Sequence, residues 1–368
     1  MIIHKPKIER IEDRIRISSF IEVESDNNLS KTLWFEVPLM YESWLSVNSN
    51  AFLIATISFA MCLRENINVE GTLSPRLVYN SNQYQSYLKY WLPHLYISRI
   101  TCNSIKQEKI EPKATVLTFS GGVDSFYTLY KHLAENETIP EYRITHCLFT
   151  HGFDVNLRQE KDFTVIKNGY EKMLSNLNIP LISIASNFRE FNDRKVPWHE
   201  VTFGPAVIST ALILDKNISK FLVASHSIPI SPCGSHPLTD HLLSTENLEV
   251  IHHGMTSSRL YKTKILSNWP VTYDYLRVCW EKTNGLLNCC ECEKCLRTMI
   301  PLELTGTLSK YSTFPKLLKI ENIKNWNYQY LLYASDILNE ADKIGRSDIS
   351  NAVKEAIKTH SSLKLCEL

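Results

Sequence analysis

Residues 114–130 have the sequence ATVLTFSGGVDSFYTLY, and this stretch decides the expected fold. The apolar run 115–119 predicts a buried strand, and residues 120–125 predict a sharp turn into an apolar-periodic helix. Gly121 and Gly122 allow the backbone to approach a phosphate closely. The N–H groups of the first helical turn have no partner within the helix, so a strand, such a turn and a helix together form an anion-binding site.

The side chains of this loop add to the same chemistry. Ser120 and Ser125 supply hydroxyl donors. Asp124 is a carboxylate among expected phosphates, which makes sense if a divalent cation such as Mg²⁺ bridges them. The alternative is an ordinary strand-to-helix turn whose serine and aspartate only cap the helix. Six consecutive residues in this order are far more specific than a pair of glycines.

The overall composition limits the classes of function. The chain has 368 residues, 44% apolar and 21% charged, and we take two domains as the working count. Lys and Arg total 40 against 39 Asp and Glu, without the basic surplus typical of proteins that hold nucleic acid. The N-terminus is charged, and no apolar run approaches the ~18 residues that span a bilayer. We therefore expect a cytoplasmic protein with no membrane or nucleic-acid partner.

Residues 1–110 predict an accessory domain with no catalytic constellation. Alternating apolar residues over 6–45 indicate a β-meander, and the apolar run 51–62 indicates a buried helix. Residues 76–79 indicate another strand, and residues 83–92 a helix that ends at a proline. The tryptophans of this region are expected in its core, in preference to a base-stacking surface.

From Ala114 onward, strand and helix patterns alternate, which predicts a doubly wound parallel sheet. The expected strands are 115–119, 142–150, 181–185 and 220–224, and the expected helices end near 134 or span 159–176 and 206–214. Ligands of such sheets bind beyond the carboxyl ends of the strands. Residues 120–125, 150–154, Asn187 and 225–227 should therefore line one crevice.

Residues 231–259 depart from this alternation and predict a long loop over the active face. The segment contains several groups that could suggest a second metal site: His236, Asp240, His241, His252 and His253. Their spacing matches no common zinc pattern, so histidines of a surface loop are the preferred interpretation. Contact of Asp240 or His236 with a substrate is a separate hypothesis.

Five of the ten cysteines lie between residues 279 and 295, which indicates a metal site more than disulfides in a cytosolic chain. With Cys290 set aside, the spacing is C-x9-C-x2-C-x2-C, formed by Cys279, Cys289, Cys292 and Cys295. Four thiolates on tight turns can close a tetrahedral, structural zinc site. Lys294 and Arg297 would offset its negative charge. An iron–sulfur cluster is the alternative.

The loop resembles the SGGxDS pyrophosphate loop of the ATP-pyrophosphatase (PP-loop) superfamily, and it lacks the Gly-Lys-Ser/Thr ending of a Walker loop. The resemblance implies a HUP-type sheet, binding of ATP with Mg²⁺, and cleavage of ATP between the α and β phosphates as a substrate oxygen is adenylated. The ATP-binding residues that it implies are Ser120, Gly121, Gly122, Val123, Asp124, Ser125 and Thr150.

Together with the cysteines, the loop is similar to the 7-cyano-7-deazaguanine synthase (QueC) branch of that superfamily, over roughly residues 115–297. That branch carries a structural zinc site of comparable spacing. Residues 262–265, KTKI, look like the K-x-E-I segment that precedes its zinc cysteines. This similarity makes Lys262 the better of two candidates for contact with the phosphate or the acyl adenylate. Lys262 or Arg259 would stabilise the α-phosphoryl transition state, while Asp124 would hold Mg²⁺ in part.

Two segments depart from that branch. The family has an R-N pair where this chain has Phe203-Gly204, and a Y-P-D-C-R segment where residues 234–240 read GSHPLTD. The chain thus keeps the motif that resembles the ATP-binding loop and differs from the family in the segments that recognise the base. This combination is similar to that of divergent paralogues associated with antiphage defence or specialised biosynthesis. Residues that could contact the substrate are therefore hypotheses: His151, Asp154, Gly204, His236 and Asp240.

The expected activity is adenylation of a small-molecule carboxylate, followed by attack of ammonia or an amine to give an amide, with release of AMP and pyrophosphate. A second activation could convert the amide to a nitrile. One alternative is conjugation of a deazaguanine-type acid to an amine on a protein partner or another macromolecule, which the N-terminal domain would present. A tRNA sulfur transferase and a non-catalytic ATP-binding subunit are further alternatives.

The expected domains are therefore residues 1–110, a PP-loop domain over 114–300 that includes the cysteine knuckle, and a helical extension over 301–368. Helical patterns at 328–341 and 351–358 predict helices that pack on the sheet or on a second subunit and take no part in chemistry.

Overall fold

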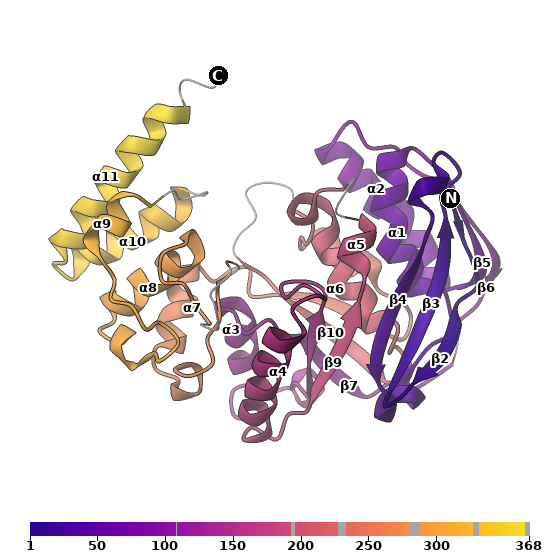
Figure 1. Ribbon diagram of the computed structural model, residues 1–368, viewed down its shortest axis with the longest axis horizontal. Coiled ribbons are helices and arrows are strands. Elements are labelled where there is room, and N and C mark those ends of the chain that lie inside the picture. Colours follow the sequence, from indigo (N-terminus) through magenta and orange to yellow (C-terminus); the bar gives the residue numbers. More distant parts are fainter. Residues whose placement is uncertain are drawn as a thin grey trace. The chain divides into compact units, whose positions relative to one another are not determined.

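The computed structural model describes residues 1–107, 109–192, 196–226, 233–279, 281, 287–326 and 331–364 (Figure 1). These residues form two compact units. The first contains described residues of 1–119, 131–225 and 233–255, and the second contains 120–130, 226 and 256–364. The units interleave along the chain, so the expected boundaries near residues 110 and 300 do not coincide with this division.

One eleven-stranded sheet forms the frame of the first unit. Its strands are β1 (Ile2–Ile3), β2 (Lys7–Ile11), β3 (Arg14–Glu22), β4 (Lys31–Pro38), β5 (Ile67–Leu73), β6 (Ile100–Ile105), β7 (Ala114–Thr118), β8 (His146–His151), β9 (Leu181–Ser186), β10 (Ile218–Ala224) and β11 (Glu249–His253). They follow the order β11-β10-β7-β8-β9-β4-β3-β1-β5-β6, with β2 paired to β3. The five strands from β11 to β9 are parallel. The expected mixed α/β fold with a large, mostly parallel sheet is confirmed.

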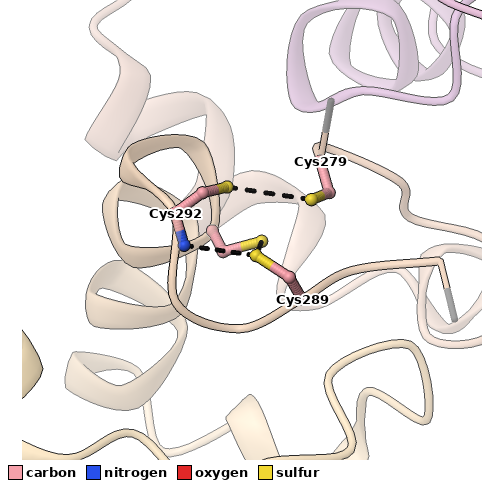
Figure 2. A group of neighbouring side chains, drawn as sticks. Cys279, Cys289 and Cys292 are labelled. Carbon is pink, nitrogen blue, oxygen red and sulfur yellow. Dashed lines mark hydrogen bonds between the residues drawn. The ribbon is translucent and has the colours of Figure 1, made fainter. Parts of the chain in front are cut away.

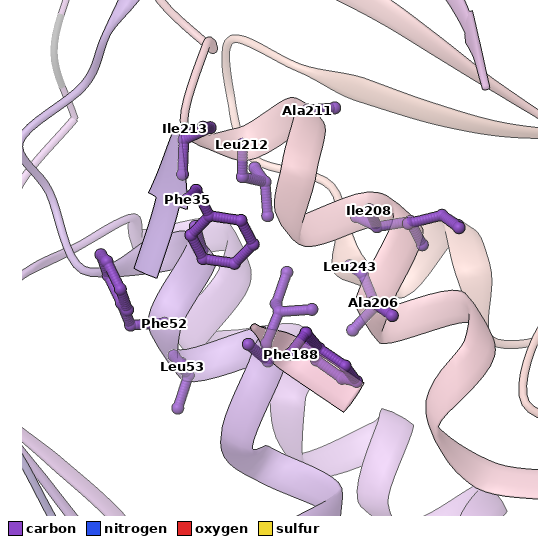
Figure 3. Close-up of a cluster of buried hydrophobic side chains, with 14 of the residues drawn as sticks. Phe35, Phe52, Leu53, Phe188, Ala206, Ile208, Ala211, Leu212, Ile213 and Leu243 are labelled. Atoms are coloured by element: carbon purple, nitrogen blue, oxygen red, sulfur yellow. The ribbon is translucent and has the colours of Figure 1, made fainter. Parts of the chain in front are cut away.

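The N-terminal meander is present as β2, β3 and β4, but it continues the main sheet. Strand β4 pairs antiparallel with β9 through Phe35 opposite Ser186 and Glu36 opposite Ala185. The cores are continuous as well, because N-terminal and later side chains belong to one buried cluster. Figure 3 shows this cluster around Phe35, Phe52 and Leu212. Residues 1–110 are thus built into the first unit.

Helices cover this sheet. They are α1 (Asn50–Leu63), α2 (Pro75–Trp91), α4 (Glu160–Ser175), α5 (Phe188–Asn192) and α6 (Phe203–Leu212). Helix α1 packs against α6, which also contacts β10. The strand expected at residues 76–79 is wrong, because these residues begin α2. Ser74 caps that helix by accepting from the Leu77 amide at 3.1 Å, and Pro75 occupies its first turn, where no N–H is needed.

The long loop expected over residues 231–259 is also wrong in part; residues 231 and 232 lie outside the described chain. The segment contains a 3₁₀ turn, Asp240–Leu243, and the edge strand β11, which pairs in parallel with β10. Leu248 and Val250 are buried and fix this strand against the core. The many polar residues of the segment conceal these apolar positions in the sequence.

The second unit is helical. Its helices are α3 (Val123–Lys131), α7 (Arg259–Leu266), α8 (Glu293–Leu304), α9 (Ile320–Lys324), α10 (Leu331–Lys343) and α11 (Ser347–Lys364). A small apolar core joins α8 to α9, α10 and α11 and includes Ile300, Trp326 and Ile337. The expected helical C-terminus is confirmed, although Tyr328, the expected start of one helix, lies outside the described residues. Within the described chain, no helix has both the length and the apolar character needed to cross a bilayer.

Candidate functional site

The glycine-rich loop links β7 to α3, as the sequence predicts. Gly121 has φ +75°, a left-handed conformation that glycine adopts without strain. The turn is braced internally, since the Ser120 hydroxyl accepts from the Gly122 amide at 3.3 Å and the Ser125 hydroxyl donates to the Gly122 carbonyl at 3.0 Å. The Gly121 carbonyl accepts from the Arg277 amide at 2.8 Å. Because α3 begins at Val123, the amides of its first turn lack intrahelical acceptors.

Two cations of α7 converge on Asp124 within the second unit. Arg259 and Lys262 are three residues apart and therefore lie on one face of the helix. The Lys262 Nζ lies 3.0 Å from Asp124 Oδ1, and the Arg259 Nη1 contacts Oδ2 at 2.5 Å. Lys262 is fully buried, with its Nζ 5.6 Å from the centre of the Tyr127 ring. The structure thus joins the three expected catalytic residues at the glycine-rich loop.

Electrostatics keep the Asp124 carboxylate ionised. Burial alone would raise its pKa, but the charges of Lys262 and Arg259 and the hydrogen bond from Lys262 lower it below the ordinary value. Both carboxylate oxygens are engaged by these cations. From the sequence we expected Asp124 to bind a bridging Mg²⁺. Its pairing with Lys262 and Arg259 was not predicted, because α7 lies more than 130 residues further along the chain.

Helix α8 also contacts this cluster, through Thr298 and Arg297. Thr298 accepts from Arg259 Nη2 at 3.4 Å, while the buried Arg259 Nε has no hydrogen-bond partner among the described residues. Arg297 is buried beside Glu293 and above the Tyr333 ring, and burial followed by the charge of Arg259 lowers its pKa. Arg297 is therefore a neighbour of the Asp124 cluster. Its expected part in offsetting the charge of the cysteines stays a prediction.

The four expected cysteines come together at the N-terminal end of α8, whose third residue is Cys295. Figure 2 shows the side chains of Cys279, Cys289 and Cys292 turned toward one another. The sulfur atoms of all four cysteines lie within 4.8 Å of one another. The Cys279 and Cys292 sulfurs are 3.8 Å apart, as are those of Cys289 and Cys295. A tetrahedron with ~2.3 Å zinc–sulfur bonds has edges of about 3.8 Å, so the group could hold a metal ion such as zinc.

Backbone amides donate hydrogen bonds to a sulfur atom of this cysteine site. The Cys292 and Glu291 amides donate to the Cys289 sulfur at 3.2 and 3.4 Å. Cys290 has φ +68° and turns its buried side chain toward the Asn288 carbonyl, so it stands outside the group of four, as expected. N–H groups directed at sulfur favour thiolates, the form that binds metal.

Asn288 holds the two arms of the cysteine site together, and the sequence gave no sign of this role. Its fully buried side chain accepts from the Val278 and Cys279 amides at 2.8 and 3.2 Å. It also donates to the Leu276 and Thr313 carbonyls at 2.9 and 3.1 Å. One side chain thereby fixes the position of Cys279 relative to the knuckle.

Three of the predicted residues lie at or just after the carboxyl end of β8 in the first unit. Thr150 is buried in the strand. His151 is also buried, bonds the Asn156 carbonyl through Nε2 at 3.0 Å, and stacks on Phe163, so its role here is packing. Asp154 is exposed and lines a surface hollow of about 540 Å³ together with Arg158.

Asn187 and the residues after β10 complete the groups that were expected at the carboxyl ends of the strands. Asn187 accepts from the Trp34 amide and donates to the Thr32 carbonyl, both at 2.9 Å, so it joins the end of β9 to β4. Ser225 is buried, and its amide donates to the His253 carbonyl. Ser227 lies outside the described residues. The single crevice expected from the sequence stays a prediction.

Residues 234–240, the segment in which substrate contacts were expected, are tightly packed in the first unit. Gly204 donates its amide to the Gly234 carbonyl at 2.8 Å, and a Cβ on Gly204 would meet that oxygen at 2.3 Å. Asp240 is only 1% exposed and receives three donors: the Ser235 hydroxyl at 2.6 Å, the His236 amide at 3.0 Å and His252 Nδ1 at 2.8 Å. The structure therefore brings Gly204, His236 and Asp240 together.

The histidines of this segment are not uniformly surface residues, which corrects that expectation. His241 is exposed, whereas His236 is 9% exposed and the His252 side chain 5% exposed. Within the described chain, the four cysteines are the only group whose ligand atoms converge for a metal, so a histidine metal site is absent there.

Comparison with known proteins finds no family model, curated protein or solved structure that matches this chain.

Proposed function

We propose that the protein is an ATP-dependent adenylate-forming enzyme that activates a carboxylate and transfers the acyl group to ammonia or an amine, as in the 7-cyano-7-deazaguanine synthase branch of the PP-loop superfamily. The observation that carries the proposal is the convergence of Lys262 and Arg259 on Asp124 at the glycine-rich turn. A purely structural turn needs no buried lysine. A fully buried cationic side chain beside an anion-binding turn is suited to phosphate chemistry.

In this proposal, different residues of the second unit bind the pyrophosphate, the α-phosphate and the metal ion. Amides at Gly122, Val123 and Asp124 would hold the departing pyrophosphate at the start of α3. In the proposed complex, Lys262 and Arg259 exchange the Asp124 carboxylate for oxygens of the α-phosphate, where charge develops as the adenylate forms. The Asp124 carboxylate would then be free to hold Mg²⁺, and a bound ion would supply charge neutralisation at the leaving pyrophosphate.

The cysteine group would hold a structural zinc ion in this proposal. Its four sulfurs leave no open coordination position for a substrate, so its part in the reaction is indirect. Helix α8 starts at this site and supplies Thr298, a hydrogen-bond acceptor for Arg259. A bound ion would thereby fix the helix that orients a reacting cation.

ATP–pyrophosphate exchange tests the proposal directly. The wild-type protein with ATP, Mg²⁺ and a panel of carboxylic acids, starting with 7-carboxy-7-deazaguanine, should incorporate labelled pyrophosphate into ATP. Lys262→Met removes the buried charge while keeping a side chain of similar length. We expect it to lower the exchange rate roughly 10²–10³-fold, the usual effect of losing one group that stabilises a transition state.

Lys264→Met is the matched control on the same helix. The Lys264 Nζ bonds Glu340 at 2.7 Å, and its side chain is 37% exposed. This variant should exchange pyrophosphate at the wild-type rate. Absence of exchange with every acid, or equal exchange by wild type and Lys262→Met, would contradict adenylation by this site.

A further inference from the structure

The surface hollow of about 540 Å³ in the first unit has a described lining that includes no residue of the Asp124 cluster or of the cysteine group. This lining comes from three segments: the start of β4, the loop between β8 and α4, and helix α5. Strands β8 and β9 are parallel neighbours and β4 runs antiparallel to β9, so the three segments meet at the carboxyl edge of β8 and β9. Ligands of open α/β sheets bind beyond this edge, and the volume is in the range of pockets that hold small molecules.

Hydrogen bonds hold the walls of the hollow in place. Gly152 has φ +101°, and its amide donates to the Val155 carbonyl at 2.8 Å, which closes the turn after β8. A Cβ on Gly152 would meet the Ser186 carbonyl oxygen at 2.1 Å, so this turn lies directly against the end of β9. The Asn187 side chain donates to the Thr32 carbonyl at 2.9 Å and fixes the start of β4. The hollow is therefore pre-formed, which lowers the entropic cost of binding a ligand.

Each of the three segments contributes one basic side chain: Lys31, Arg158 and Arg189. Lys31 and Arg158 are exposed, and neither side chain makes an ion pair or a hydrogen bond with another described residue. Arg189 is half-buried, with its guanidinium carbon 4.5 Å from the centre of the Trp198 ring. A phosphate group carries close to two negative charges and three acceptor oxygens at neutral pH, so cations from several segments can share it. The basic lining therefore favours a phosphate as part of the ligand.

Two carboxylates of the same lining, Asp154 and Glu190, narrow the class of ligand. Both are exposed, and neither side chain makes an ion pair or a hydrogen bond with another described residue. A carboxylate repels a bare inorganic anion, but it accepts hydrogen bonds from hydroxyl groups. The described lining contains one aromatic residue, Phe153, and its 8% exposure leaves little surface on which a nucleic-acid base could stack. These groups fit a phosphate ester with hydroxyl groups and without an aromatic base.

We propose that this hollow is a binding site for a phosphorylated sugar. Lys31, Arg158 and Arg189 hold the phosphate, while Asp154 and Glu190 accept hydrogen bonds from the sugar hydroxyls. The site is built from residues of the first unit alone. It adds a second ligand to the protein and is independent of the proposed adenylation.

Isothermal titration calorimetry of the 368-residue chain with ribose 5-phosphate and glucose 6-phosphate tests this site. We expect saturable binding of at least one of them, and roughly 10-fold weaker binding of the matching free sugar and of inorganic phosphate, because each lacks half of the contacts. Arg158→Gln and Lys31→Gln change exposed side chains without partners in the described chain, so both variants should fold. Each should weaken binding roughly 10-fold or more, the usual effect of losing a hydrogen bond to a charged group.

Lys161→Gln is the matched control, because Lys161 is exposed on α4 and is not part of the described lining. It should bind the sugar phosphate as the wild type does. An equal loss of binding in Lys161→Gln would indicate general charge attraction, and unchanged binding in both Arg158→Gln and Lys31→Gln would place the ligand elsewhere. Either result overturns the proposal, as does the absence of saturable binding of both sugar phosphates at millimolar concentrations.

Asp154→Asn separates a sugar phosphate from a simple anion. The substitution removes a charged acceptor for hydroxyl groups, so we expect weaker binding of the sugar phosphate. It also removes a repelling charge, so inorganic phosphate should bind more strongly. Unchanged or stronger binding of the sugar phosphate would overturn the assignment. None of these titrations contains ATP, so their outcome does not depend on whether the protein forms an adenylate.

Discussion

Different interactions stabilise the two units of this protein internally. The first is organised by one eleven-stranded sheet and a large apolar cluster that joins residues from the N-terminus to residue 250. The second has a small apolar core at its C-terminal helices. Its middle part, from α7 to the start of α8, is organised by four cysteines, the clamp of Asn288 and the charges around Asp124.

This difference predicts different sensitivities. Apolar burial responds to changes of volume and hardly to ions or pH. Metal coordination and charge pairing respond to chelators and protons, respectively. The first unit should therefore be weakened chiefly by cavities, and the second chiefly by loss of an ion or of a charge.

The largest expected effect is loss of the metal. Cys292→Ser removes one of four thiolates from a site of the kind whose apparent zinc affinity is about 10–16 kcal/mol in small domains. We expect loss of bound metal and of hydrogen-exchange protection in residues 259–304, with the sheet strands still protected. Elemental analysis and exchange measured by mass spectrometry test this. Cys290→Ser, in the same knuckle but outside the group of four, should keep its metal; full metal content in Cys292→Ser would contradict the assignment.

The next effect concerns the first unit. Phe35 on β4 is fully buried with its ring centre 5.7 Å from that of Phe52 on α1. Phe35→Ala should lower the free energy of unfolding by about 3–5 kcal/mol, measured in urea, because it leaves a cavity. Phe20→Ala, at a position 45% exposed on β3, should have little effect. If Phe35→Ala unprotects only β1 to β6 and spares β7 to β10, the N-terminal region is a separate domain after all.

The smallest effect is electrostatic and depends on pH. The folded-state pKa of Asp124 lies below its unfolded value of ~3.9, because Lys262 and Arg259 outweigh the opposing effect of burial. The resulting stability is fully present above the unfolded pKa and is lost as the pH falls through the folded pKa. Asp124→Asn should cost about 1.5–3 kcal/mol at pH 7, and the gap to wild type should begin to narrow as the pH falls below about 4.

Urea unfolding at several pH values, followed by a probe in the second unit, tests the Asp124 prediction. Asp274→Asn is a suitable control because Asp274 is exposed and accepts only from the Ser312 hydroxyl, at 2.6 Å, in the described chain. A gap that stays constant down to pH 3 would mean that the Asp124 charge is not responsible.

Local patterns in the sequence were sufficient for several features. Apolar periodicity located four of the five parallel strands of the main sheet, β7, β8, β9 and β10, and the helices α3, α4 and α6. The order Ser-Gly-Gly-Val-Asp-Ser placed a tight turn before α3, and the cysteine spacing identified all four residues of the metal group. Each of these signals lies within a short segment, so neighbouring residues carry the information.

The wrong predictions have a common cause: each rested on the composition of a segment and overlooked a helix cap, a few buried positions or the packing around the segment. Residues 76–79 resemble a strand by composition, but a cap at Ser74 and a proline in the first turn make them helical. Residues 231–259 are rich in polar groups, so the two apolar positions that fix β11 were overlooked. The exposure of a histidine depends on what packs over it, and the sequence of the segment does not contain that information.

The sequence by itself located a glycine-rich turn between a strand and a helix, and four cysteines with the spacing of a metal site. Only the tertiary structure decided which residues meet. It joined β4 to β9 and so merged the N-terminal meander with the main sheet, it brought Lys262 and Arg259 to Asp124, and it buried His252 against Asp240. The physical reason is that strand pairing, charge pairing and burial depend on contacts between distant parts of the chain, whereas turns and ligand spacings are set by residues that are adjacent in sequence.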